Sequence, residues 1–319
     1  MYSTKMILAE LSYDGSLEDL FALLDRVRAS ARAGEPGREL PRRLRRLAPA
    51  WADLSPGRAG FGEAPVQGGL FDEPGPVSPE GSAFSGFPPD PAALGGAAED
   101  LFTVSADAFD AFVHAWMSEL PVDGEILRFG CKVLAAAEEA AGVSGSGPWT
   151  GREAARGGAA RAAGNRGDGD VRAVMEAAYK AVHEIDRLMG LLRFSPDPRW
   201  GYLARCGPDG FVIPALAGHF TLRFGGDPWA IIDEKRGIVL AREAGGEARL
   251  LPAAALFPQP VPGRDSGANS PDKDPWEKLW LRYHKAVNND ARKNPGLQRR
   301  FMPERYWKYL PELSDKVTR

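Results

Sequence analysis

The chain has 319 residues, of which 44% are hydrophobic and 26% are charged, and this composition is typical of a globular protein with one large or two smaller domains. Its formal net charge of −3 argues against a protein that binds nucleic acid over its whole surface, so any such contact must be local. The two cysteines, Cys131 and Cys206, exclude a disulfide framework, a zinc ribbon and the three-cysteine iron–sulfur cluster of radical enzymes.

Residues 1–54 are predicted to form a strand followed by helices. The apolar run at residues 5–11 is typical of a strand, and a turn at residues 13–16 follows it. Ser16 suits a helix N-cap, because its hydroxyl can accept a hydrogen bond from a backbone N–H at the start of the helix. Apolar residues then recur at helical spacing, so we expect one helix as far as about Arg32.

Three segments have the composition of loops or linkers. Residues 55–97 contain eight Pro and ten Gly, so burial cannot offset the entropy of ordering and we predict loop or disorder there. Residues 142–169 are nearly all Gly, Ala, Ser and Arg and are predicted to be a flexible insertion. Residues 258–274 contain four Pro and are predicted to be a linker, whereas residues 98–141 carry the apolar spacing of helices.

Residues 170–257 are predicted to form the core of the protein. Its first element is the clearest amphipathic helix of the chain, at residues 171–192. Residues 202–206 and 211–213 then flank a Gly-Pro-Asp-Gly turn and are predicted to pair as a hairpin.

The second half of this core combines a helix with two more strands. A helix is expected at residues 215–224, and the strands at residues 229–233 and 237–241 flank another turn. The predicted fold class is therefore α+β, with helices around a small, mostly antiparallel sheet and a basic helical segment at the C-terminus.

Residues 275–319 differ in charge from the rest of the chain. From Trp276 to Arg319 there are eleven Lys and Arg against five Asp and Glu, with seven aromatic residues among them. Asp274 suits a helix N-cap and Pro275 the first helical position, so we expect a helix to begin here.

This terminal helix is expected to have two distinct faces. One face follows the i, i+4, i+7, i+11 spacing of buried positions, and we predict that it packs on the body of the protein. Its residues are Trp276, Trp280, Tyr283 and Val287. The other face is basic and contains Lys278, Arg282, Lys285 and Arg292.

The basic residues of the C-terminal segment are candidates for binding nucleic acid. Lys and Arg at helical spacing can contact successive phosphates, and aromatic side chains can stack on bases. A solvated charged face, or a surface that docks on an acidic protein, would show the same pattern. Together with two arginines of the core, the candidates are Lys278, Arg282, Lys285, Arg292, Arg299, Arg300, Arg305, Arg223 and Arg236.

His219 and Asp233 are candidates for acid/base catalysis. They converge with Arg223 and Arg236 if the helix at residues 215–224 packs on the strand that follows it. A His and an Asp within reach of each other can exchange protons with a substrate, and two Arg can hold a phosphate. The alternative is a structural network of ion pairs and hydrogen bonds.

Asp14 is a third catalytic candidate, because it follows the N-terminal strand. Gly15 and Ser16 come next and place backbone N–H groups at a helix N-terminus, where a phosphate can bind or a base can be positioned. A plain turn with a helix cap is the alternative. The four histidines are scattered without an i, i+4 pair, so no metal site is expected.

Several of these motifs also resemble a known family. They are the turn at residues 13–16, Arg187 with Gly190-Leu-Leu-Arg193-Phe194, His219-Phe220 with Arg223-Phe224, Trp229 to Arg236, and the long tail from Trp280 to Glu312. The pattern resembles the bacterial DNA metabolism proteins that end in a domain of unknown function, number 4130. Such members look like partners of a radical S-adenosylmethionine (radical-SAM) protein of DNA-repair type, and some are similar to the N-terminal parts of uracil-DNA glycosylase fusions.

The resemblance and the residues together imply a function. We expect an accessory protein in DNA repair or modification that binds DNA and acts together with a radical-SAM partner. One alternative is an enzyme acting on DNA that uses His219, Asp233 and Asp14 as acid/base groups. Another is a protein–protein adaptor without affinity for DNA. No stretch approaches the ~20 apolar residues of a membrane span, so we expect a cytoplasmic protein without a membrane segment, and no cofactor.

Overall fold

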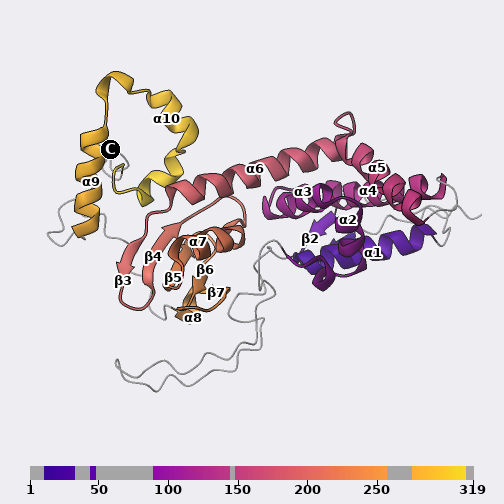
Figure 1. Cartoon of the computed structure of the whole chain (residues 1–319), viewed down its shortest axis with the longest axis horizontal. Coiled ribbons are helices and arrows are strands. Elements are labelled where there is room, and N and C mark those ends of the chain that lie inside the picture. The colour runs from indigo at the N-terminus through magenta and orange to yellow at the C-terminus, as the bar shows by residue number, and fades with distance from the viewer. Residues whose placement is uncertain (1–10, 33–43, 48–88, 144–147, 257–274, 314–319) are drawn as a thin grey trace, which may run out of the picture. The chain divides into compact units, whose positions relative to one another are not determined.

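The structure is a computed structural model, and it describes residues 11–32, 44–47, 89–143, 148–256 and 275–313 (Figure 1). These residues fall into two compact units. The first contains the described residues up to Glu184 together with Asp209–Val212, and the second contains the remainder. Helices combine with a five-stranded mixed sheet and a two-stranded sheet, which confirms the predicted α+β class.

The first unit is mainly helical. Its elements are β1 (Leu11–Tyr13), α1 (Leu17–Arg32), β2 (Leu44–Arg46), the 3-10 turn η2 (Pro91–Leu94), α2 (Gly96–Val104), α3 (Ala106–Met117), α4 (Asp123–Val143), α5 (Pro148–Gly164) and most of α6 (Gly169–Leu191). Strands β1 and β2 pair in parallel. The core forms where α1 meets α3, because Phe21 stacks on Phe112 with ring centroids 4.5 Å apart and both side chains are buried.

Helix α5 lies in the segment 142–169 that its composition predicts to be a flexible insertion. Residues Pro148–Gly164 are instead helical, and α5 packs closely along α4. A Cβ added at Gly158 would lie 2.3 Å from the carbonyl oxygen of Ala136 and 2.8 Å from Cβ of Ala140. The small residues therefore allow two helices to approach each other, a role that composition cannot separate from flexibility.

The second unit is built on the five-stranded sheet, in the order β3-β4-β5-β6-β7. The strands are β3 (Ser195–Asp197), β4 (Gly201–Cys206), β5 (Trp229–Asp233), β6 (Ile238–Arg242) and β7 (Ala248–Pro252). Every neighbouring pair is antiparallel except β4 and β5, which are parallel. A parallel pair needs a crossover connection, and this one includes η3 (Ile213–Leu216) and helix α7 (Ala217–Phe224).

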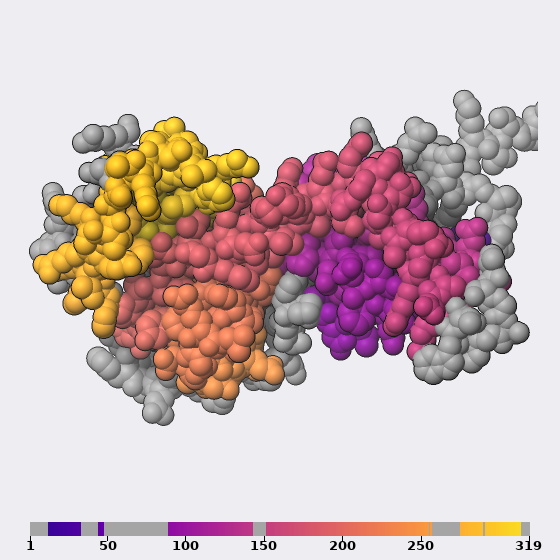
Figure 2. Space-filling model, turned by 45° about the horizontal axis from the view of Figure 1, so that its top comes forward, coloured from indigo at the N-terminus to yellow at the C-terminus, as the bar shows by residue number. Residues whose placement is uncertain are grey.

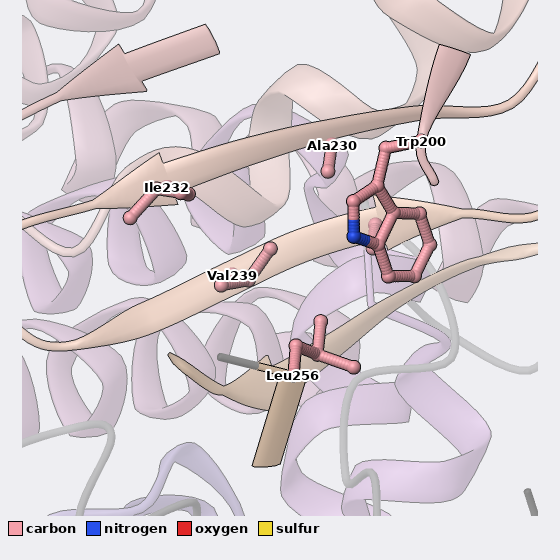
Figure 3. Close-up of a cluster of buried hydrophobic side chains, with 6 residues drawn as sticks. Trp200, Ala230, Ile232, Val239 and Leu256 are labelled. Atoms are coloured by element: carbon pink, nitrogen blue, oxygen red, sulfur yellow. The ribbon is translucent and has the colours of Figure 1, made fainter. Parts of the chain in front are cut away.

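One face of this sheet carries a hydrophobic cluster. Trp200, Ala230, Ile232, Val239 and Leu256 are buried together there, as Figure 3 shows. Leu256 comes from the short helix α8 (Ala253–Leu256), which follows β7 directly. The cluster fixes β5 and β6 at the centre of the sheet.

The predicted hairpin of residues 202–206 with residues 211–213 is wrong. Strand β4 pairs with β3 and β5, and the turn after it leaves the sheet. The Glu184 carboxylate accepts hydrogen bonds from the backbone N–H groups of Asp209 and Gly210, each 2.9 Å long, and Phe211 donates its N–H to the carbonyl of Met117. These hydrogen bonds to α6 and α3 replace the strand pairing that the turn residues suggested.

The last described range begins at Pro275 and forms the C-terminal segment of the second unit. Its elements are α9 (Pro275–Val287), η4 (Asp290–Arg292), α10 (Pro295–Phe301) and η5 (Glu304–Tyr309). The helix start at Pro275 agrees with the prediction, while the predicted N-cap Asp274 and the predicted linker 258–274 lie outside the described residues. Most of the predicted loop 55–97 also lies outside them, and from Pro91 it is helical.

Substitution Gly158→Ala tests the close contact between α4 and α5. The added methyl group has no space against the Ala136 carbonyl, so we expect a loss of about 1–3 kcal/mol in the free energy of unfolding, measured by urea denaturation. The matched control is Gly151→Ala in the same helix, where nothing lies within 4 Å of the new Cβ. That control should raise stability by roughly 0.5–1 kcal/mol. Equal effects of the two substitutions would contradict the contact.

Candidate nucleic-acid interface

Asp233 and Arg236 form a fully buried ion pair at the turn between β5 and β6. Oδ2 of Asp233 accepts a hydrogen bond of 2.8 Å from Arg236, and Oδ1 accepts the backbone N–H groups of Lys235 and Arg236 at 3.0 and 3.3 Å. Arg236 also donates to the carbonyl of Pro208 at 3.1 Å. Burial raises the pKa of Asp233, and the Arg236 charge opposes this effect. Neither side chain has exposed surface for a substrate or a phosphate.

His219 and Arg223 lie on α7, which packs against the other end of β5. Phe220 of that helix contacts Trp229, the first residue of β5, whereas Asp233 is the last. The His219 ring is half-buried, and its Nε2 atom has no hydrogen-bond partner among the residues that the structure describes. Arg223 is exposed. The structure therefore brings Asp233 together with Arg236 but does not bring His219 into that pair.

Asp14 lies in the first unit and takes part in the cap of α1. Its Oδ1 accepts hydrogen bonds from the backbone N–H and the hydroxyl of Ser16, at 2.8 and 2.7 Å. The Ser16 hydroxyl in turn accepts the N–H of Asp19 at 3.1 Å, as an N-cap does. The local geometry is that of the turn and cap, and the three acid/base candidates form no common site within either unit.

The buried carboxylate of Glu312 anchors the C-terminal segment. Oε1 accepts a hydrogen bond of 2.7 Å from Arg193, and Oε2 accepts one of 2.9 Å from Nε1 of Trp280 on α9. The Arg193 guanidinium also lies 5.0 Å from the centroid of the Trp280 ring. Burial by itself would raise the pKa of Glu312, but the hydrogen bonds from Arg193 and Trp280 outweigh it and hold the pKa below its ordinary value.

A hydrophobic cluster and a tyrosine hold the same segment to the rest of the second unit. Trp307, Leu310 and Leu313 are buried against Leu191, at the end of α6, and Met302. The hydroxyl of Tyr309 donates to Glu234 at 3.0 Å. It sits so close to Gly207 that a Cβ there would be 2.7 Å away, so a larger residue at 207 would displace it.

Helix α9 buries a different side from the one that its aromatic spacing predicts. The half-buried residues follow i, i+3, i+4, i+7 and are Glu277, Trp280, Leu281 and His284. At 3.6 residues per turn this side lies about 80° around the helix from the predicted stripe. Trp276 and Tyr283 are 69% and 57% exposed, so the prediction that they pack on the body of the protein is wrong.

The exposed side of α9 combines aromatic and basic residues, and we call it the outward face. It consists of an apolar stripe, Trp276, Leu279 and Tyr283, and next to it a basic row, Lys278, Arg282 and Lys285. No hydrogen bond or ion pair joins the basic row to any residue that the structure describes. Figure 2 shows the segment that carries this face in yellow. From Pro275 to Phe301 there are seven Lys and Arg against two Asp and Glu, so a polyanion is attracted here.

The remaining predicted nucleic-acid contacts differ in their surroundings. Arg292 and Arg300 are exposed. Arg299 forms an exposed ion pair of 2.8 Å with Glu304, and the Arg305 guanidinium lies over the ring of Tyr306. Arg236 is the exception, because its side chain is buried with Asp233.

The described residues contain no candidate metal site and no candidate membrane span. In that part of the chain no group of three or more His, Cys, Asp or Glu could hold a metal ion. No helix there is both long enough and apolar enough to cross a membrane.

Substitution Glu312→Gln tests the anchor of α9. The amide keeps a partner for Trp280 but leaves the Arg193 charge without its counter-ion. We therefore expect the free energy of unfolding to fall by about 1–3 kcal/mol at neutral pH. Because the folded-state pKa of Glu312 lies below the ordinary 4.5, its stabilising effect is present above that pH and is lost as the pH falls through the folded-state pKa. The difference between wild type and variant, measured by urea denaturation, should therefore disappear in acid. A difference that stays constant down to acid pH would contradict the ionised anchor.

Comparison with known proteins gives a family-model match for part of the chain. Neither the curated proteins nor the solved structures contain a match. Residues 154–312 match the family model of the domain of unknown function DUF4130. This range includes the five-stranded sheet, Arg193, helix α9 and Glu312. The matched range also includes the outward face of α9, so this surface lies in the part of the chain that is similar to DUF4130.

Proposed function

We propose that this protein is a nucleic-acid-binding accessory protein, and that its binding surface is the outward face of α9. The observation that carries the proposal is the basic row beside an exposed apolar stripe on one helix. An exposed apolar stripe can mark an interaction surface, and the cations beside it favour a partner with negative charge.

The spacing of the basic row suits a phosphate backbone. Lys278, Arg282 and Lys285 are four and three residues apart, which is about 6 and 4.5 Å along the helix axis. Their long side chains can therefore reach successive phosphates of one strand. Because no residue in the described part of the chain neutralises them, binding a polyanion breaks no ion pair in the protein.

The accessory role is proposed because the acid/base candidates form no common site within either unit. In the second unit Asp233 is buried with Arg236, and His219 lies against the ring of Phe220. In the first unit Asp14 accepts hydrogen bonds from Ser16, the N-cap of α1. A separate enzyme then supplies the chemistry. The family resemblance of the sequence suggests that this enzyme is a radical-SAM protein and that the shared process is DNA repair or modification.

A protein–protein adaptor is the second candidate function. It is favoured by the exposed aliphatic side chains of α9, Leu279 and Val287, which suit a protein surface better than a nucleic acid. In this case the basic row would pair with acidic residues of the partner.

The triple substitution Lys278→Glu, Arg282→Glu and Lys285→Glu separates these functions. If the basic row contacts phosphates, the variant should lose most of its affinity for labelled DNA in fluorescence anisotropy. For a single strand, the slope of log affinity against log salt concentration should become shallower by about 2, because about three phosphate contacts are removed.

The matched control reverses three exposed cations of the first unit, Arg166, Arg172 and Lys180, and so makes the same change in net charge. This control should keep wild-type affinity and salt dependence. Wild-type protein that shows no salt-sensitive DNA binding would reject the proposed function. Capture of an acidic partner that survives nuclease treatment, in the absence of DNA binding, would instead support the adaptor.

A further inference from the structure

The outward face of α9 presents two kinds of surface in parallel. Trp276 and Tyr283 lie on the same side of the helix, about 10 Å apart along its axis, and both expose more than half of their side-chain surface. Leu279 lies between them and is also exposed. The basic row runs beside this stripe on the side that faces away from the half-buried residues. One helix therefore exposes both flat rings and cations to solvent.

Only an unpaired strand can use both surfaces. In a duplex the faces of the bases are stacked on one another, so a duplex offers phosphates to the basic row and leaves the two rings uncovered. In a single strand the bases can turn away from the backbone and stack on aromatic side chains while the phosphates contact cations. Stacking on an aromatic ring accepts any base, so it needs no hydrogen-bonding groups that read sequence.

The position of the single acidic residue of α9 is compatible with a nucleic-acid ligand. Its one acidic residue, Glu277, lies on the half-buried side and away from the basic row. The outward face therefore offers no carboxylate that would repel a phosphate backbone.

Building on the proposed function, we propose that the outward face of α9 binds single-stranded nucleic acid. Unpaired bases stack on Trp276 and Tyr283, and the phosphates of the same strand contact Lys278, Arg282 and Lys285. The contacts use base faces and phosphates, which single-stranded DNA and RNA share, so the ligand class is a single strand of either kind.

The test measures anisotropy of labelled oligo-dT, oligo-rU and a mixed-sequence duplex of equal length with the full chain. The variant is Trp276→Ala with Tyr283→Ala. Each stacked base lost should weaken binding, so affinity for both single strands should fall about tenfold or more, while affinity for the duplex should change less than about twofold. Binding of one single strand but not the other identifies the sugar as a further determinant and supports the stacking.

Two variants control for folding and for the loss of an exposed ring. Trp276→Tyr with Tyr283→Phe keeps both aromatic faces and should restore most of the affinity for oligo-dT. Tyr179→Ala removes a tyrosine of the first unit that is 61% exposed, and it should leave affinity for every oligonucleotide unchanged.

The outcomes separate this inference from the function on which it rests. If duplex and single strands bind equally, and the double alanine variant binds both like wild type, the stacking inference is overturned while nucleic-acid binding stands. If no oligonucleotide binds in a salt-sensitive manner, both fail. If the same concentration of poly-glutamate displaces oligo-dT from the wild type and from the double alanine variant, the outward face recognises negative charge alone. The inference is then also overturned.

Discussion

The C-terminal half of this protein depends on the buried carboxylate of Glu312. A buried charge is costly unless it is paired and hydrogen-bonded, and this one is 2% exposed with Arg193 on one oxygen and Trp280 on the other. These two hydrogen bonds connect Glu312, near the last described residue, to Arg193, just after the end of α6, and to α9. The hydrogen bond from Nε1 of Trp280 to Glu312 holds Trp280 on the half-buried side of α9, together with Leu281 and His284. In this orientation Trp276 and Tyr283 are exposed.

The same physical rule explains why the catalytic candidate Asp233 serves the fold, as the buried Glu184 also does. Asp233 pairs with Arg236 inside the sheet turn, and Glu184 accepts two backbone N–H groups from the turn at Asp209 and Gly210. Each buried carboxylate is satisfied by hydrogen bonds: that of Asp233 orders its own turn, and that of Glu184 joins α6 to the turn at Asp209 and Gly210. The charges left at the surface of α9 are the cations of the basic row, which is why the proposed function rests on binding rather than on acid/base chemistry.

Periodicity and turn residues predicted strands β4, β5 and β6 and helix α7, which have local signals, but they did not predict strands β3 and β7. Local signals gave wrong predictions where contacts with residues distant in sequence determine the structure. The Gly and Ala of α5 indicated flexibility, since nothing local shows that α4 lies against them. The aromatic spacing of α9 predicted that Trp276 and Tyr283 are buried, but the half-buried side, on which Trp280 donates to Glu312, lies about 80° around the helix from that stripe. In the sequence Glu312 stands out only as part of a family motif. No spacing rule connects it to Arg193, which is more than a hundred residues away.

Hydroxyl-radical footprinting read by mass spectrometry tests the central claim most directly, because it reports the exposure of each aromatic ring. In the free protein we predict strong oxidation of Trp276 and Tyr283 and weak oxidation of Trp280, in keeping with the anchored orientation of α9. Addition of oligo-dT should protect Trp276 and Tyr283 and leave the exposed Tyr179 unchanged. Equal oxidation of Trp276 and Trp280 in the free protein, or no protection of Trp276 and Tyr283 by oligo-dT, would contradict the account.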